Sequence, residues 1–191
     1  MRKLIAGMKI SIDGKMEGPE GTADWVEAWS EDYGLMPQID ACLLGAGMYP
    51  GYEHYWTAIQ NEPQTPVWIT GKAPTPEELE WARFITRTPH YVLSSTLNSA
   101  LWPKTSFIRK LDDIADLKRQ SGKDVYLIGG ARTAASLIDA RLVDELRLIV
   151  HPLIAGEGKA LFAAADHRRG LDLRKVQQLP GGRVSLVYGI G

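Results

Sequence analysis

The sequence predicts an α/β fold with a mixed sheet, parallel in its centre and antiparallel along its C-terminal edge. Strand-like apolar runs alternate with amphipathic helical patterns as far as residue 140, an order that favours parallel strands joined by helices. From residue 143 onward, strand-like segments follow one another. The last two flank Pro180-Gly181-Gly182, a turn typical of a hairpin. The length of 191 residues suits one domain spanning residues 1–191.

The first half of the chain is expected to alternate between strands and helices. Residues 4–12 form a strand, because apolar and polar residues alternate there and Asp13-Gly14 supplies a turn. Asp24 and Glu27 have the spacing of a capping box, which predicts a helix over residues 25–33. Apolar runs, helical spacing and a proline at a helix start predict four further elements, namely strands at 39–44 and 67–69 and helices at 47–60 and 76–88.

The second half is expected to contain six strands and two helices. Leu111, Ile114 and Leu117 recur at helical spacing, which predicts a helix between the strands on either side. A second helix follows Gly129-Gly130 over residues 132–140. The predicted strands cover residues 91–93, 105–108, 125–128, 143–150, 171–178 and 183–190.

The composition excludes several classes of protein. The 22 basic and 23 acidic residues nearly cancel, so no global field favours nucleic acid or an anionic membrane surface. Cys42 is the only cysteine, which excludes a disulfide framework and favours a reducing compartment. No apolar run approaches the roughly 20 residues of a membrane helix, and the N-terminus does not have the pattern of a signal peptide. We therefore expect a cytoplasmic protein without a membrane partner.

Two glycine-rich turns each follow a buried strand and precede a helix. The first contains Gly45, Gly47 and Met48, and the second runs from Gly129 and Gly130 into Ala131, Arg132 and Thr133. Glycine lets backbone amides approach phosphate oxygens, and the start of the next helix adds partial positive charge. The alternative is that small residues there only permit tight packing of strand against helix.

A third strand end has consecutive hydroxyl groups, on Ser94, Ser95 and Thr96. These groups could donate hydrogen bonds to phosphate or ribose, or they could simply cap a turn. The spacing of Gly45, Gly47 and Gly51 does not match the dinucleotide-binding fingerprint of the Rossmann fold, and the turn lacks the lysine of a P-loop. The four histidines have no partners at metal-ligand spacing, so no metal is expected.

Two carboxylates and one tryptophan are candidates for the chemistry of a reducible ring. Asp13 ends the first strand beside a flexible glycine-rich loop, and Asp24 starts the following segment. Either carboxylate could orient ring nitrogens or assist their protonation, although turn formation and helix capping are the alternatives. Trp25 borders the loop that would cover a substrate.

Several segments together resemble the dihydrofolate-reductase-like superfamily. Within it, the chain resembles single-domain proteins similar to the reductase half of the bacterial bifunctional deaminase-reductase of riboflavin biosynthesis, and the likeness covers nearly its whole length. The segments that carry the resemblance are Ser11-Ile12-Asp13-Gly14, Tyr91-Val92-Leu93-Ser94-Ser95-Thr96-Leu97, Val125-Tyr126-Leu127-Ile128-Gly129-Gly130-Ala131, Leu142-Val143-Asp144-Glu145-Leu146 and His151-Pro152-Leu153-Ile154-Ala155-Gly156-Glu157-Gly158.

The resemblance implies a three-layer αβα domain that binds NADPH and transfers a hydride to a small heterocycle. It implies an activity like that of 5-amino-6-(5-phosphoribosylamino)uracil reductase, and it also implies a homodimer. The adenosine phosphate would lie by Ser94–Thr96, the pyrophosphate on Gly129–Thr133, and the nicotinamide near Ala6 and the loop after Asp13.

Two departures from the family pattern leave alternatives open. Relatives commonly have Gly-Arg-x-Thr where this chain has Gly45-Ala46-Gly47-Met48, so a cation and a hydroxyl are missing and NADH is also possible. Riboflavin-pathway reductases often have an acid where this chain has Ile128. A dihydrofolate reductase acting on a pterin, or a nucleotide-binding module without turnover, are therefore the alternative functions.

Overall fold

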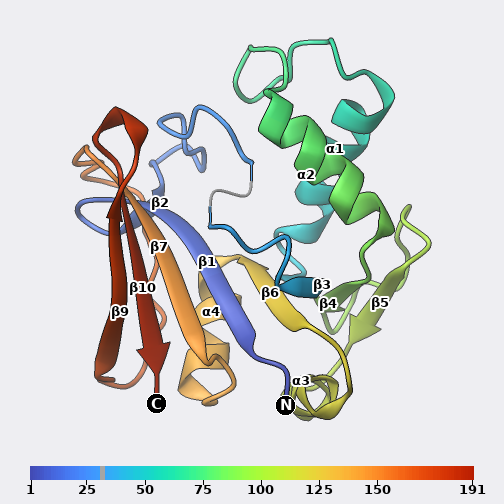
Figure 1. Ribbon diagram of the computed structural model, residues 1–191, viewed down its shortest axis with the longest axis vertical. Coiled ribbons are helices and arrows are strands. Elements are labelled where there is room, and N and C mark those ends of the chain that lie inside the picture. The colour runs from blue at the N-terminus through green and yellow to red at the C-terminus, as the bar shows by residue number, and fades with distance from the viewer. Residues whose placement is uncertain (31–32) are drawn as a thin grey trace.

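The central element is an eight-stranded sheet between two layers of helices (Figure 1). It is seen in a computed structural model that describes residues 1–30 and 33–191. The strand order is β5-β4-β3-β6-β1-β7-β10-β9. In that order the strands span Thr105–Ile108, His90–Leu93, Ile39–Gly45, Asp124–Gly129, Leu4–Ser11, Glu145–His151, Val184–Ile190 and Leu171–Gln178.

The sheet is mixed, as the sequence predicts. All neighbouring pairs from β5 to β7 are parallel, whereas β10 runs antiparallel to both β7 and β9. The turn at Pro180–Gly182 is a short 3-10 helix with Gly181 at φ +73°, and it joins the last two strands as a hairpin. The expected parallel centre and antiparallel C-terminal edge are therefore confirmed.

Two hydrophobic cores lie on opposite faces of the sheet. Leu4 and Ala6 of β1 pack with α3 (Leu111–Arg119) and α4 (Ala131–Asp139). Ile5, between them in sequence, faces the core that contains α1 (Tyr49–Asn61) and α2 (Pro76–Arg87). Successive side chains of a strand point to opposite faces, so a strand buried on both faces needs a continuous apolar run. This arrangement gives the three layers.

The expected helix over residues 25–33 is not present. Residues 25–30 form turns and irregular backbone, and residues 31–32 lie outside the described part of the chain. The amide of Trp29 donates to the Glu78 carboxylate, and the Lys9 ammonium donates to the carbonyl oxygen of Ala28. These long-range bonds occupy backbone groups that a helix would pair internally, so tertiary contacts override the local capping pattern.

The expected strand at residues 67–69 is also wrong. Residues 68–70 form a turn, in which the amide of Gly71 donates to the carbonyl oxygen of Val67. Conversely, two short strands were not predicted: β2 (Lys15–Glu17) pairs antiparallel with β8 (Lys159–Ala160) in a separate two-stranded sheet. Segments of three and two residues are too short for their polarity pattern to indicate a strand.

His90 in β4 is a buried titratable group. Its Nδ1 lies 2.9 Å from the carbonyl oxygen of Thr88, and its ring packs against Tyr52 and Trp102. Burial lowers the pKa of His90 to about 4, although the hydrogen bond to Thr88 acts in the opposite sense. The imidazole is therefore neutral in the folded protein at neutral pH.

We expect the free energy of unfolding to fall by about 3 kcal/mol between pH 6.5 and pH 4 because of His90. In this range the unfolded chain binds a proton at His90 and the folded chain does not, so acid favours unfolding. His90→Gln removes this term. Urea unfolding of both proteins across this range measures it, and equal acid dependence in the two would contradict the assignment.

Candidate functional site

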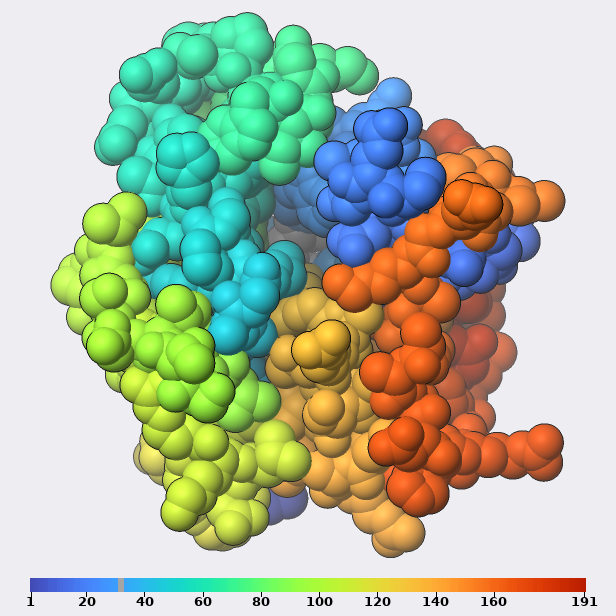
Figure 2. Space-filling view, turned by 180° about the vertical axis from the view of Figure 1, so that it is seen from behind, coloured from blue at the N-terminus to red at the C-terminus, as the bar shows by residue number. Residues whose placement is uncertain are grey.

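A cavity of about 840 Å³ lies above the carboxyl ends of the parallel strands β3, β4 and β6. Ligands of open α/β sheets bind at this edge. The space-filling view shows the surface hollowed between the blue N-terminal loop, the cyan start of α1 and the gold start of α4 (Figure 2). Aromatic side chains line one end of the cavity, which we call the aromatic end (Trp29, Tyr52, Tyr55). Glycines cluster at the other end, which we call the glycine end (Gly45, Gly47, Gly130).

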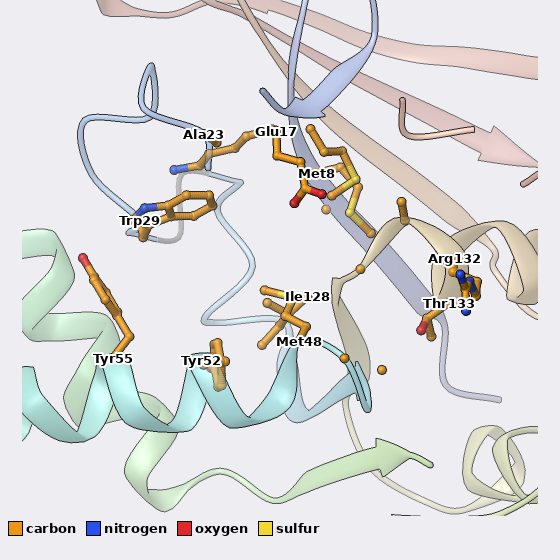
Figure 3. A pocket seen from close by; sticks show the side chains of 18 of the residues that line it. Met8, Glu17, Ala23, Trp29, Met48, Tyr52, Tyr55, Ile128, Arg132 and Thr133 are labelled. Atoms are coloured by element: carbon orange, nitrogen blue, oxygen red, sulfur yellow. The ribbon is translucent and has the colours of Figure 1, made fainter. Parts of the chain in front are cut away.

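The glycine end is formed by the starts of two helices. The N-caps of α1 and α4 are Met48 and Gly130, and neither helix start has a side-chain cap. The first backbone amides of α4 are therefore available to an anion, whereas Pro50 in the first turn of α1 has no N–H to donate. The dipoles of both helices favour negative charge there. Arg132 and Thr133 lie at this end of the cavity, with Met48 and Ile128 between them and the aromatic end (Figure 3).

Gly45 lies in the lining and Gly129 just outside it, and a Cβ on either glycine would come too close to a neighbouring side chain. A Cβ on Gly45 would overlap the Thr133 hydroxyl and lie 3.2 Å from the Thr133 Cβ. A Cβ on Gly129, which has φ +152°, would lie 2.8 Å from the sulfur of Met48. The Gly129–Gly130 peptide bond is cis. The absence of side chains brings the β3 turn and the start of α4 together as one wall of the cavity.

Of the three hydroxyl-bearing residues predicted at the end of β4, two line the cavity. Ser94 and Ser95 line the cavity, and Thr96 is exposed outside its lining. The hydroxyl oxygen of Ser94 accepts hydrogen bonds from the amides of Thr96 and Leu97, at 3.2 and 2.8 Å. The Ser94 hydroxyl thus shapes the turn as well as facing the cavity.

The aromatic end is held by a buried carboxylate on α2. Glu78 Oε1 accepts hydrogen bonds from the amide of Trp29 at 2.8 Å and from the hydroxyl of Tyr55 at 3.0 Å. Burial raises the pKa of Tyr55, so its hydroxyl stays protonated and donates. From the opposite wall, Lys9 Nζ donates to the carbonyl oxygens of Ala28 and Ser30, at 2.8 and 3.2 Å. Segment 28–30 is therefore held from both sides.

Asp13 lies outside the lining of the cavity. Its carboxylate accepts hydrogen bonds from the Ser11 hydroxyl at 2.7 Å and from the amides of Ala155 and Gly156, both at 2.9 Å. These bonds, the Ser11 hydroxyl foremost, lower the pKa of Asp13 to about 2. In this structure the Asp13 carboxylate joins the end of β1 to the loop after β7.

The other predicted residues are distributed unevenly about the cavity. Asp24 is exposed and lines a separate hollow of about 200 Å³, and Trp25 is half-buried outside the main lining. Ala6 is fully buried in the sheet, next to the lining residue Gly7. The predicted residues that do line the cavity are Gly45, Gly47, Met48, Ser94, Ser95, Gly130, Ala131, Arg132 and Thr133.

The sequence gives no indication that several other residues line the cavity. Glu17 of β2 and Lys159 of β8 form an ion pair at 3.2 Å and both line the cavity, as does the buried Lys9. Glu17 and Lys159 lie in strands too short to recognise, and their pairing is long-range. Within residues 1–30 and 33–191, no helix is long and apolar enough to span a membrane, and no three potential metal-ligating side chains gather.

The sheet order, the helix layers and the cavity at the strand ends define a dihydrofolate-reductase-like fold. A dihydrofolate reductase of Enterococcus faecalis, solved in complex with NADP(H), superposes with a TM-score of 0.56 at 14% identity, over 99% of this chain and 96% of that chain. The residues 2–185 match the model of the RibD C-terminal domain, and the chain belongs to this family.

Two further relatives support the assignment. The chain is 31% identical to the uncharacterized protein YyaP of Bacillus subtilis (strain 168), over 98% of this chain and 94% of the relative. The Thermotoga maritima diaminohydroxyphosphoribosylaminopyrimidine deaminase/5-amino-6-(5-phosphoribosylamino)uracil reductase superposes with a TM-score of 0.61 at 13% identity, over 100% of this chain and 57% of that chain. The predicted family and fold are thereby confirmed.

Proposed function

We propose that this protein is an NADPH-dependent reductase of a small heterocycle of the aminouracil or pterin kind. The observation that carries the proposal is one cavity that has two uncapped helix starts at its glycine end and aromatic side chains at its other end. A dinucleotide needs an anion site and a flat reactive ring needs apolar walls, and this cavity offers both. Family membership supports the same function.

The residues present fit a dinucleotide. The amides at the start of α4, together with Arg132 and Thr133, would hold the pyrophosphate, and Ser94 and Ser95 would face the adenosine side. When bound, the reduced nicotinamide supplies a hydride. Reduction of a C=N bond takes that hydride at carbon and one proton at nitrogen, so the remaining work of the chain is orientation, exclusion of water and a route for the proton.

The aromatic end supplies orientation and exclusion of water. Trp29 and Tyr55 line this end, and both are fixed through Glu78. Lys9 fixes segment 28–30 from β1, so the wall keeps its shape without a ligand. Pre-formed walls of this kind reduce the entropy lost when a flat ring is held against the donor.

Fluorescence titration with NADPH and NADH tests the proposal. We expect saturable NADPH binding, followed by oxidation of the bound cofactor when an accepted heterocycle is added. Failure of both cofactors to bind saturably would refute the proposal. Binding without oxidation across aminouracils and pterins would instead indicate a nucleotide-binding module without turnover.

Two expectations stay predictions at this point. The homodimer implied by the family resemblance is tested by size-exclusion chromatography with light scattering. A cytoplasmic location is tested by fractionation of the cells that make the protein.

A further inference from the structure

The lining of the cavity contains one carboxylate among the described residues, and that carboxylate is Glu17. Its side chain lies between Trp29 and Met8 in the close view of the cavity (Figure 3). Lys159 Nζ lies 3.2 Å from Glu17 Oε1, and the Glu17 side chain keeps 32% of its surface exposed. The printed contact of the ion pair is made through Oε1, one of the two carboxylate oxygens.

The backbone holds Glu17 in this position. Glu17 lies opposite Lys159 in the β2–β8 pair, so the ion pair follows from the register of the two strands. Gly158, at φ +123°, passes so close that a Cβ there would overlap the carbonyl oxygen of Glu17. A glycine before Lys159 therefore allows β8 to approach β2, and the carboxylate stands on a paired strand rather than a loose loop.

The cations of the described lining are Lys9, Arg132 and Lys159. Lys9 donates to two carbonyl oxygens of segment 28–30, and Lys159 pairs with Glu17. Arg132 belongs to the start of α4 at the glycine end. Near Glu17, the cation of the described lining is therefore Lys159, which is already paired with this carboxylate. A phosphate group there would have to compete with Glu17 for Lys159 and would be repelled by the Glu17 carboxylate.

We propose that Glu17 binds the substrate ring directly by accepting hydrogen bonds from its N–H groups, and that the substrate has no phosphate group on the substituents of this ring. The inference rests on the proposed reductase function and specifies its substrate class. A carboxylate accepts hydrogen bonds and donates none, so it selects lactam, amidine or amino N–H groups at the ring edge. The aromatic side chains of the aromatic end would pack against the faces of the substrate ring.

Binding of a matched pair of compounds tests the absence of phosphate. The pair is 5-amino-6-(5-phosphoribosylamino)uracil, the compound in the name of the Thermotoga enzyme, and its dephosphorylated form. Calorimetric titration of each into the complex with NADP⁺, which has no hydride to transfer, is expected to give at least tenfold tighter binding of the dephosphorylated compound. Equal or tighter binding of the phosphate, or no binding of either compound, overturns the proposal.

Glu17→Gln tests the contact itself, with Glu20→Gln as the matched control. Glu20 is exposed, lies three residues after Glu17 and does not line the cavity. Since charge-assisted hydrogen bonds are among the stronger ones, Glu17→Gln should weaken ring binding about tenfold or more. NADPH binding and thermal stability should stay unchanged in both variants, and unchanged ring affinity in Glu17→Gln contradicts the proposal.

Lys159→Met separates the two roles that a cation could have here. If Lys159 only balances Glu17, both compounds should respond alike to the substitution. A selective loss of the phosphorylated compound would show that Lys159 binds phosphate, and would overturn the inference. The proposed function fails differently, because its failure is absence of NADPH binding in the unmodified protein.

Discussion

Glu78→Ala is expected to lower the free energy of unfolding by about 3 kcal/mol. Glu78 is 2% exposed, and its two oxygens accept hydrogen bonds from the Trp29 amide, the Tyr55 hydroxyl and the Thr75 amide. Alanine leaves these donors without their acceptor and removes the capping box of α2. Urea unfolding at neutral pH measures the loss.

Two further variants make the Glu78 result specific. Glu80→Ala changes an exposed carboxylate of the same helix and should alter stability by less than about 0.5 kcal/mol. Glu78→Gln keeps one acceptor oxygen, so an intermediate loss is expected. A loss in Glu78→Ala no larger than that in Glu80→Ala would show that the buried carboxylate does not hold segment 28–30.

Gly45→Ala is expected to weaken NADPH binding at least tenfold and to destabilise the fold by about 2 kcal/mol. The added methyl group would overlap the Thr133 hydroxyl, so β3 and the start of α4 must move apart. The amides proposed to hold the pyrophosphate move with α4. Fluorescence titration with NADPH and urea unfolding measure the two effects.

Gly51→Ala is the matched control for stability. Gly51 lies inside α1, where a Cβ would meet no atom within 4 Å. Alanine favours helix interiors, so stability should stay equal or rise by up to about 1 kcal/mol. Adding Thr133→Ala to Gly45→Ala should recover part of the lost stability, because it removes the overlapping hydroxyl. Equal stability of Gly45→Ala and the unmodified protein would exclude the proposed close contact.

The glycine end of the cavity was predictable because its signals are contiguous in sequence. The strand at residues 125–128, Gly129-Gly130 and the helix that follows are adjacent, so one local pattern indicates a strand end, a turn and a helix start. The structure places Gly130 through Thr133 in the lining of the cavity. Their role in binding a cofactor is the subject of the titrations above.

The aromatic end was not predictable in the same way. The capping pattern at Asp24 and Glu27 predicts a helix, but Lys9 and Glu78 bind the backbone of the segment from distant elements. A local pattern reports only the preferences of neighbouring residues, whereas a buried charge that needs hydrogen-bond partners can reorganise a whole loop.

The sequence by itself determined the α/β class, most of the strands and helices, and the position of glycine turns at strand ends, because each depends on periodicity within a short segment. Only the tertiary structure decided the strand order and which acid reaches the cavity. Asp13 binds amides of the loop after β7, Asp24 faces a separate hollow, and Glu17 enters the lining through its pairing with β8. These outcomes depend on contacts between distant segments, and no local pattern encodes the register of such contacts.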